Sequence, residues 1–447
     1  MTTRTTEVFR SLSPALALAA AALASPNPGT EERAVSVLVL AEDLSVWKGT
    51  LLSVDAGTVT VADESRRVVR CEAPGTLAVV VCDPLAAQEL GVGSVPPLGR
   101  RSPPDQLTLA RAIKSESQGV MVITDGQRFI GAPASGASTA APAAPGGDDA
   151  LTWVSERFGP MTIPLERLAW IAFPEGANTP ARRSLPPGLG GADDALLLRN
   201  GDTVRGLIAR VGASITLDPA PGEGGEPRTF DRERVVAASL SNPLERASGP
   251  RLWLADGTVV APASGEQVPR AGSPRPVRAA LGGTAPVVPF DVRGYTPDAS
   301  RIVPLSSMDA PSFKPIEPRV YAPTPRVLAH ADDLVTPGLW SLDAGDVALS
   351  GPVEAVWTLD ERAVGFVCSV TLENESDPWA GCVVVVTAPG GASAKVELSP
   401  ESPGAPVALR FQPQKGATLT VRVEAGAFGA VNDRVRLSRP LVVRRPG

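Results

Sequence analysis

The fold of this chain is decided by the stretch Leu196-Leu-Leu-Arg199-Asn200-Gly201-Asp202-Thr-Val-Arg205-Gly206-Leu-Ile. Two apolar runs flank an Asn-Gly pair, which is a strong β-hairpin signal because both central positions of a type I′ turn need φ > 0. We therefore predict a strand on each side of Asn200-Gly201. Gly206 lies just beyond the turn, where a residue without a side chain lets a strand bend sharply.

The same pattern occurs elsewhere in the chain. The stretch Val120-Met-Val-Ile-Thr124-Asp125-Gly126-Gln-Arg-Phe-Ile130-Gly131 has Asp-Gly at the turn, and a looser copy has Val37-Leu-Val-Leu40 before Val46-Trp47-Lys48-Gly49. The copies also end alike, since Leu165-Glu-Arg-Leu-Ala-Trp-Ile-Ala-Phe173 matches Arg232-Glu-Arg-Val-Val-Ala-Ala-Ser-Leu240. Such units of about 50 residues suit small, strongly bent barrels, in which Gly131 and Gly206 let the strand curve. This layout resembles the SH3-like or Sm-like barrels.

A fourth, partial copy starts at Leu252-Trp-Leu-Ala-Asp256-Gly257-Thr-Val-Val260, but its continuation is rich in proline. From about residue 321 onward, seven or eight short strands follow at intervals of roughly ten residues, which is the pattern of a β-sandwich. They are expected at 348–349, 355–359, 363–372, 381–387, 394–398, 407–411, 418–423 and 435–443.

The 43 Gly and 46 Pro residues among 447 favour many short strands over long helices. We predict an all-β chain of tandem small barrels followed by a β-sandwich, with one short helix at 105–113. The expected parts are a signal peptide at 1–24, barrels at 33–90, 105–175 and 193–245, a disordered insertion at 132–149, a Pro-rich partial repeat and linker at 250–318, and the sandwich at 320–447.

The N-terminus predicts export. Arg4 and Arg10 precede an apolar stretch from Leu12 to Ala24, which has the length of a signal-peptide core and is too short to span a bilayer. Ala22-Leu-Ala24 fits the small-x-small cleavage rule. We expect an exported protein of the periplasm, cell envelope or extracellular space, with a disordered Ala-rich leader as the alternative. No later stretch is long enough for a membrane span.

Charge argues against a nucleic-acid partner. The formal net charge is −6, and the basic residues form no block that could follow a phosphate backbone. The four cysteines favour the disulfide pairs Cys71–Cys82 and Cys368–Cys382, because each local pair is expected on neighbouring strands; free buried thiols are the alternative. A structural metal would need Cys-x-x-Cys or histidine partners, so we expect neither metal nor cofactor.

The last third of the chain resembles a known family. Ile302-Val-Pro-Leu305 is followed by Gly338-Leu-Trp340, Val356-Trp357-Thr-Leu-Asp360, Phe366-Val-Cys-Ser-Val370, Gly381-Cys-Val-Val-Val-Val386 and Gly426-Ala-Phe-Gly429-Ala-Val-Asn-Asp433. This order is similar to that of NPCBM carbohydrate-binding modules, galactose-binding-like β-sandwiches frequent in exported proteins of planctomycete-type bacteria. In such proteins barrel repeats with a Gly-Asp-x-x-x-Gly hairpin often precede the module, as Gly201-Asp202 to Gly206 does here.

The chain departs from this family at two places. Ser350-Gly351-Pro352 stands where the family has Gly-x-His, and Asp433-Arg434-Val435 stands where it has Asp followed by an aromatic residue. Sugar rings stack on exposed aromatic faces, so Trp340 and Trp379 are candidate ligand residues, together with Asp433. A packing or disulfide-covering role is the alternative for Trp379. The other five tryptophans lie in apolar, strand-like runs and are expected in the core: Trp47, Trp153, Trp170, Trp253 and Trp357.

Catalytic patterns are weak. The single histidine, His330, lies in a Pro-rich stretch away from any expected nucleophile. Glu373 and Asp377 are close enough in sequence to suggest a glycosidase pair, but they fall in a predicted turn, where acidic residues usually face water. The sequence therefore predicts a non-enzymatic envelope protein whose barrels are spacers or interaction units and whose sandwich binds a glycan or a protein. The alternatives are a scaffold that contacts envelope proteins after loss of the sugar site, and an enzyme of unrecognised type.

Overall fold

The structure is a computed structural model that describes residues 35–55, 58–63, 65–72, 75–81, 119–134, 150–174, 193–219, 224–254, 256–263, 275–279, 281–287, 292–316, 326–328, 342, 345–373, 377–427, 429 and 433–446. The predicted signal peptide, the predicted helix at 105–113, Cys82, His330 and Trp340 lie outside these ranges. The prediction of an all-β chain is confirmed, because strands account for most of the described residues. None of the helices in the described ranges is long and apolar enough to cross a membrane.

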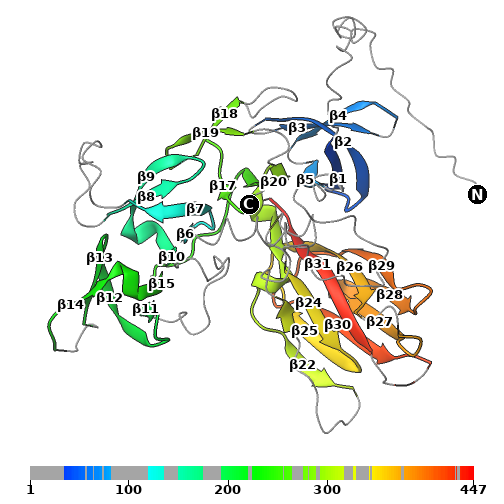
Figure 1. Cartoon of the computed structure of the whole chain (residues 1–447). Coiled ribbons are helices and arrows are strands. Elements are labelled where there is room, and N and C mark those ends of the chain that lie inside the picture. Colours follow the sequence, from blue (N-terminus) through cyan, green and yellow to red (C-terminus); the bar gives the residue numbers. More distant parts are fainter. Residues whose placement is uncertain are drawn as a thin grey trace, which may run out of the picture. The chain divides into compact units, whose positions relative to one another are not determined.

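Three five-stranded modules lie within residues 35–81, 119–172 and 194–239 (Figure 1). Module 1 contains β1 (Val35–Ala41), β2 (Val46–Asp55), β3 (Thr58–Asp63), β4 (Val68–Glu72) and β5 (Thr76–Val81). Module 2 contains β6 (Gly119–Ile123), β7 (Arg128–Pro133), β8 (Ala150–Ser155), β9 (Gly159–Pro164), the 3-10 turn η1 (Leu165–Arg167) and β10 (Leu168–Ala172). Module 3 contains β11 (Asp194–Leu198), β12 (Thr203–Val211), β13 (Ser214–Asp218), β14 (Arg228–Asp231), η2 (Arg232–Arg234) and β15 (Val235–Ser239).

The Pro-rich continuation of the fourth copy also forms strands. Module 4 contains β16 (Arg251–Leu254), β17 (Val259–Val260), β18 (Arg275–Arg278), β19 (Thr284–Val287) and β20 (Val292–Thr296). Pro276 lies opposite Pro286 in the separate two-stranded sheet of β18 and β19. Both strands of such a sheet are edges, and an edge strand tolerates a residue without an N–H. In every module the first strand pairs with both the second and the last.

The hairpin turns differ from the predicted type I′ geometry. Gly201 has φ 89°, whereas Asn200 is not among the residues with positive φ. The Gly201 N–H donates to Leu198 O at 3.0 Å, and Leu198 N–H donates to Asp202 O at 2.8 Å. Because only the third loop residue is left-handed, the turn is a three-residue loop in which glycine makes a bulge. Gly126 (φ 84°) and Gly257 (φ 90°) occupy the same position in modules 2 and 4.

Module 1 builds the same turn with a leucine in place of the glycine. Leu44 has φ 65°, its N–H donates to Ala41 O at 3.0 Å, and Asp43 Oδ1 accepts from Ser45 N at 2.9 Å. A left-handed leucine costs roughly 1–2 kcal/mol. Its side chain is nevertheless buried, in a cluster that includes residues of the sandwich. The turn thus presents an apolar anchor at a position where the other modules have glycine.

Three equivalent glycines allow the second strand of modules 1, 2 and 3 to lie close to its neighbour. A Cβ on Gly206 would lie 2.4 Å from Asp218 O, and one on Gly131 would lie 2.1 Å from Val154 O. A Cβ on Gly49 would lie 2.6 Å from Ala62 O. No side chain fits at such distances, so the curvature predicted from Gly131 and Gly206 depends on backbone-to-backbone contact as well as on flexibility.

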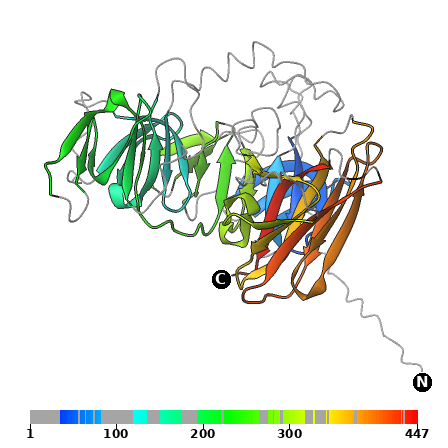
Figure 2. The same ribbon diagram turned by 90° about the horizontal axis from the view of Figure 1, so that it is seen from below.

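The modules join in pairs through their last strands. In modules 2 and 3, β10 pairs with β15 in antiparallel register, with Trp170 opposite Ser239 and Ala172 opposite Ala237. In modules 1 and 4, β5 pairs with β20, with Val79 opposite Tyr295. Figure 2 shows the strands of modules 2 and 3 side by side. Each last strand therefore has partners on both sides and is not an edge.

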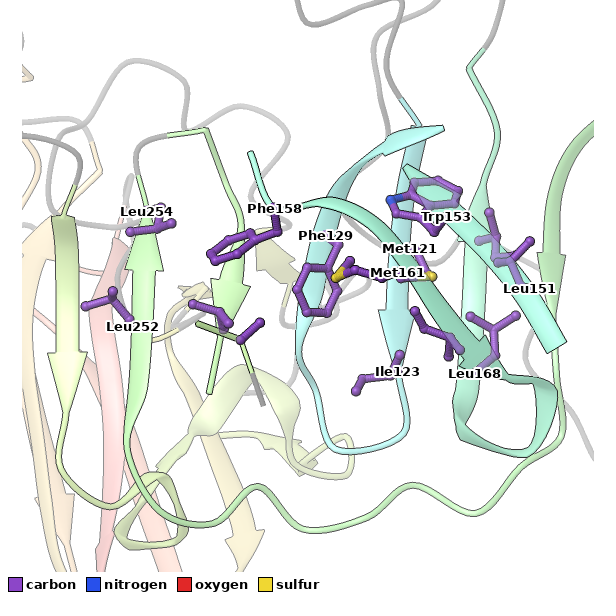
Figure 3. Close-up of a cluster of buried hydrophobic side chains, with 14 of the residues drawn as sticks. Met121, Ile123, Phe129, Leu151, Trp153, Phe158, Met161, Leu168, Leu252 and Leu254 are labelled. Atoms are coloured by element: carbon purple, nitrogen blue, oxygen red, sulfur yellow. The ribbon is translucent and has the colours of Figure 1, made fainter. Parts of the chain in front are cut away.

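One apolar core runs through the modules (Figure 3). Phe158, in the turn between β8 and β9, packs edge-to-face on Phe129 with ring centroids 6.2 Å apart. It belongs to the same buried cluster as Leu252 and Leu254 of module 4. At this boundary the buried Arg251 pairs with Asp125 at 3.1 Å, and Arg157 pairs with Asp256 at 3.0 Å.

The C-terminal part forms two sheets of antiparallel strands, and all eight predicted strand positions coincide with observed strands. One sheet has the order β23 (Arg326–Leu328), β24 (Asp346–Ser350), β31 (Arg434–Arg444), β26 (Ala363–Leu372), β29 (Gly404–Arg410), with β21 (Ile302–Pro304) also paired to β31. The other has the order β22 (Ser312–Pro315), β25 (Val353–Thr358), β30 (Thr418–Ala425), β27 (Cys382–Thr387), β28 (Ser393–Leu398). β21 and β22, which precede residue 320, pair with β31 and β25 of these sheets.

The described residues of the C-terminal part include the short 3-10 turns η4 (Ala299–Arg301), η5 (Leu305–Ser307) and η8 (Pro389–Gly391). The sandwich packs on modules 1 and 4 through a mixed apolar cluster that includes Leu44, Trp253, Ile302 and Leu441. Leu44 lies over Gly365, where an added Cβ would be 3.0 Å from Leu44 Cδ1. The buried Arg301 pairs with Glu42 at 2.9 Å in the same region.

Replacement of Gly206 by alanine should destabilise the protein. The new Cβ would collide with the Asp218 carbonyl, and overpacking of this kind costs about 1–3 kcal/mol. We expect a lower urea midpoint for Gly206→Ala, measured by circular dichroism. Gly224→Ala is the matched control, because no atom lies within 4 Å of a Cβ placed there. Equal midpoints for the two variants would contradict this account of the strand crossing.

Candidate functional site

Three connections meet at one end of the sandwich, which we call the loop end. They are the β24–β25 turn at 351–352, the β26–β27 connection at 373–381 and the β30–β31 connection at 426–433. The structure describes the first in full, residues 373 and 377–381 of the second, and residues 426, 427, 429 and 433 of the third. Strand register brings them together, since Ser350 lies opposite Arg434, Leu372 opposite Val435, and Cys382 opposite Ala425. Two of the three predicted ligand residues, Trp379 and Asp433, lie in these connections.

Asp433 is fixed against the β24–β25 turn. The Gly351 N–H donates to Asp433 O at 2.7 Å, and the Asp433 side chain is 3 % exposed. A Cβ on Gly351 would lie 2.4 Å from Val423 Cγ1 and 3.4 Å from Asp433 Cβ. Gly351 therefore leaves room for the Val423 side chain, whereas a Cβ there would meet Asp433 only in ordinary van der Waals contact. The Asp433 side chain is buried, so the charge of its carboxylate acts on neighbouring protein groups more than on solvent.

Trp379 is displayed by a tight local turn. Asp377 Oδ1 accepts from the Trp379 N–H at 2.9 Å, and Asp377 O accepts from the Ala380 N–H at 3.0 Å. The Trp379 residue is 58 % exposed, the largest exposure among the described tryptophans. The segment that carries it is held against the neighbouring connection, because a Cβ on Gly426 would lie only 2.0 Å from Gly381 O. The indole is thus a solvent-facing group on a backbone fixed at both ends of the turn.

Charged groups also lie at the loop end. The Glu373 N–H donates to Arg434 O at 2.9 Å, and its carboxylate lies 3.7 Å from Arg436 Nη2. Glu373 and Asp377, considered above as a glycosidase pair, are thus engaged separately: Glu373 with an arginine and Asp377 with a turn amide. Sequence reasoning singled out the acids but did not predict the contact between Gly381 and Gly426. The position of these glycines at strand ends is the signal that two connections touch.

The tryptophans predicted in the core are mostly there. Trp153, Trp253 and Trp357 are buried, whereas Trp47 and Trp170 are partly buried and pack against core clusters. Trp340 and His330 lie outside the described residues. Within the described ranges, His, Cys, Asp and Glu side chains do not gather in groups of three that could hold a metal ion.

The predicted disulfide between Cys368 and Cys382 is wrong. Both are free buried thiols, because Cys368 lies on β26 in one sheet and Cys382 on β27 in the other rather than on neighbouring strands. Cys71 is also a free buried thiol, and its predicted partner Cys82 is not described. Burial, together with the nearby Asp433 charge, raises the pKa of the Cys382 thiol to about 12. Burial raises the pKa values of Cys71 and Cys368 as well.

Comparison with known proteins gives distant structural neighbours. No family model matches the chain, and no curated protein matches it. The solved neighbours include two CBM51 carbohydrate-binding module structures from Clostridium perfringens. One holds CBM51-2 and INT domains of ZmpB, at TM-score 0.26 and 12 % identity, covering 32 % of this chain and 32 % of that one. The other is a CBM51 of a GH95 protein in complex with methyl-galactose, at TM-score 0.24 and 14 % identity, covering 32 % of this chain and 99 % of that one.

A third neighbour combines the M60 catalytic domain of ZmpB with its two CBM51 domains, at TM-score 0.25 and 9 % identity, over 92 % of this chain and 52 % of that one. This chain therefore spans only about a third of the first neighbour and half of the third. Each of these three neighbours contains a CBM51 carbohydrate-binding module. With TM-scores this low, no ligand or activity transfers from them to this chain.

The buried thiols should resist modification. At pH 8 their raised pKa values keep them protonated, and burial blocks access, so a thiol reagent should label none of them in the native Cys82→Ser variant. In denaturant without reductant, three thiols should react. Titration with Ellman's reagent measures both states. A single reactive thiol in denaturant would show that Cys368 and Cys382 are bonded after all.

Proposed function

We propose that this chain is an exported, non-enzymatic binding protein whose sandwich holds a glycan at its loop end. The observation that carries the proposal is the exposed Trp379 indole on the fixed turn at 377–381. Tryptophan combines a large apolar face with a polar edge, which suits it to groups that are apolar on one side and wet on the other. A sugar ring is such a group, because its C–H face is apolar and its rim carries hydroxyls.

Polar groups near the indole supply orientation. Binding sites combine apolar surface with a few placed hydrogen-bonding groups. Here the Glu373 carboxylate and the Arg434 and Arg436 guanidinium groups belong to the same end of the sandwich as Trp379. Carboxylates accept from sugar hydroxyls and guanidinium groups donate to them. The NPCBM resemblance supports the same reading, and it also favours a bacterial exported protein of planctomycete type.

In this proposal the modules hold the sandwich in place. The sandwich packs on modules 1 and 4 through Leu441 and Val443 of β31, whereas the loop end lies at the start of that strand, at Arg434. At ~3.3 Å per residue, these two positions are roughly 25 Å apart along the strand. Docking therefore leaves the loop end available to a ligand.

A scaffold role is the second candidate. Pro352 occupies the position where the resembled family has histidine, and Asp433 is buried. Both features leave fewer polar side chains that could face a sugar. The exposed Trp379 would then be an anchor for a protein partner, since tryptophan is enriched at the energetic centres of protein interfaces.

Glycan-array binding by the full chain distinguishes the two roles. We expect saturable binding to a set of glycans and a loss of at least tenfold in affinity for Trp379→Ala, which equals about 1.4 kcal/mol. Phe313→Ala is the matched control, because Phe313 is an exposed aromatic residue (39 %) on β22 of the same sandwich. A flat array from folded protein would eliminate the glycan role and favour the scaffold role.

A further inference from the structure

A group of arginines lies at the sandwich end opposite the loop end, where β26 begins and β31 stops. The Arg445 N–H donates to Arg362 O at 2.9 Å, and Arg362 Nη2 donates to Arg445 O at 2.9 Å. This reciprocal pair of bonds ties the β25–β26 turn to the end of β31. It thereby places the Arg362 guanidinium close to that of Arg444.

Asp360 is the one carboxylate paired with these guanidinium groups in the described part of the chain. The two carboxylate oxygens of Asp360 have different partners. Oδ1 accepts from the Arg362 backbone N–H at 2.9 Å, and Oδ2 pairs with Arg444 Nη2. Asp360 therefore neutralises one positive charge and leaves the side-chain charge of Arg362 without an acid.

A third arginine adds to the excess charge. Arg246 lies in the segment between β15 and β16, is exposed, and has no ion pair among the described residues. Burial lowers the pKa of the Arg444 guanidinium, and the nearby charges of Arg246 and Arg362 lower it further, against the opposite effect of Asp360. The cluster of Arg246, Arg362 and Arg444 is thus a locally positive site in a chain of net charge −6.

Two donors in this cluster lack a partner. The Nε atoms of Arg362 and Arg444 are both buried, and neither donates a hydrogen bond. A buried donor left unsatisfied costs about 1–3 kcal/mol, and more when it is charged. Natural folds rarely leave such donors without a partner. Their shared neighbourhood and excess positive charge indicate a missing acceptor that carries negative charge.

We propose that Arg362 and Arg444, aided by the nearby positive charge of Arg246, bind a tetrahedral oxyanion, the phosphate or sulfate group of a free ion or of a larger anionic ligand. Guanidinium groups match such oxygens through paired N–H donors. The oxyanion accepts from the two buried Nε donors and relieves repulsion among the three cations. The Arg444 side chain is 17 % exposed and Arg246 is exposed, so the site is open to solvent on one side.

Equilibrium dialysis of the full chain against radiolabelled phosphate or sulfate tests the site at millimolar anion and constant ionic strength set with chloride. We expect saturable uptake of a single ion per chain and at least tenfold weaker uptake by Arg362→Gln and by Arg246→Gln. Arg246 is exposed and bonded to nothing described, so Arg246→Gln keeps the test valid if Arg362→Gln fails to fold. Arg422→Gln is the control, since Arg422 is an exposed arginine paired with Glu424 on the other sheet.

A competition experiment distinguishes a free ion from a sulfated polymer as the ligand of this site. Dextran sulfate that displaces the ion far more strongly than free sulfate would assign the site to a sulfated polymer, and equal displacement per sulfate would assign it to the free ion. Absence of uptake, or uptake unchanged in both cluster variants, overturns the proposal. Trp379→Ala should leave ion uptake intact, so failure of the glycan proposal and failure of this one are distinguishable.

Discussion

Antiparallel pairing between the last strands of neighbouring modules is the interaction on which the rest of this structure depends. A module of about 50 residues buries too little surface to be robust alone, and its last strand would be an open edge. Pairing of β10 with β15 and of β5 with β20 closes these edges. The flanking bonds from Phe173 N–H to Val236 O and from Leu240 N–H to Ala169 O, both 2.9 Å, extend the first of these pairings at both ends.

That pairing creates the surface on which the sandwich rests. Modules 1 and 4 together supply Leu77, Trp253 and Val259 to the cluster that also contains Ile302 and Leu441. Leu44 shows how specific this contact is. In the other modules a glycine occupies the left-handed position of the same turn, whereas here a leucine accepts backbone strain and is buried beside Gly365. The burial of an apolar side chain, worth roughly 1.5–3 kcal/mol, offsets that strain.

The long strand β31 then separates the two candidate sites. Its first residues face the β26–β27 connection, and its last residues bring Arg444 to the β25–β26 turn. An aromatic site for an uncharged ring lies at one end, and a guanidinium site for an oxyanion lies at the other. Because a sandwich strand is held on both sides along its length, neither site needs the other in order to form.

The sequence by itself determined the local structure of the chain. Alternation of apolar residues and the Gly-rich turns placed eight sandwich strands and three modules, because strand period and turn chemistry act over a few residues. Only the tertiary structure decided how distant segments meet. It separated Cys368 from Cys382 by placing their strands in opposite sheets, and it paired the last strand of the Pro-rich fourth module with the last strand of module 1. It also gathered Arg246, Arg362 and Arg444, which no spacing in the sequence connects, because long-range contacts depend on the packing of whole strands.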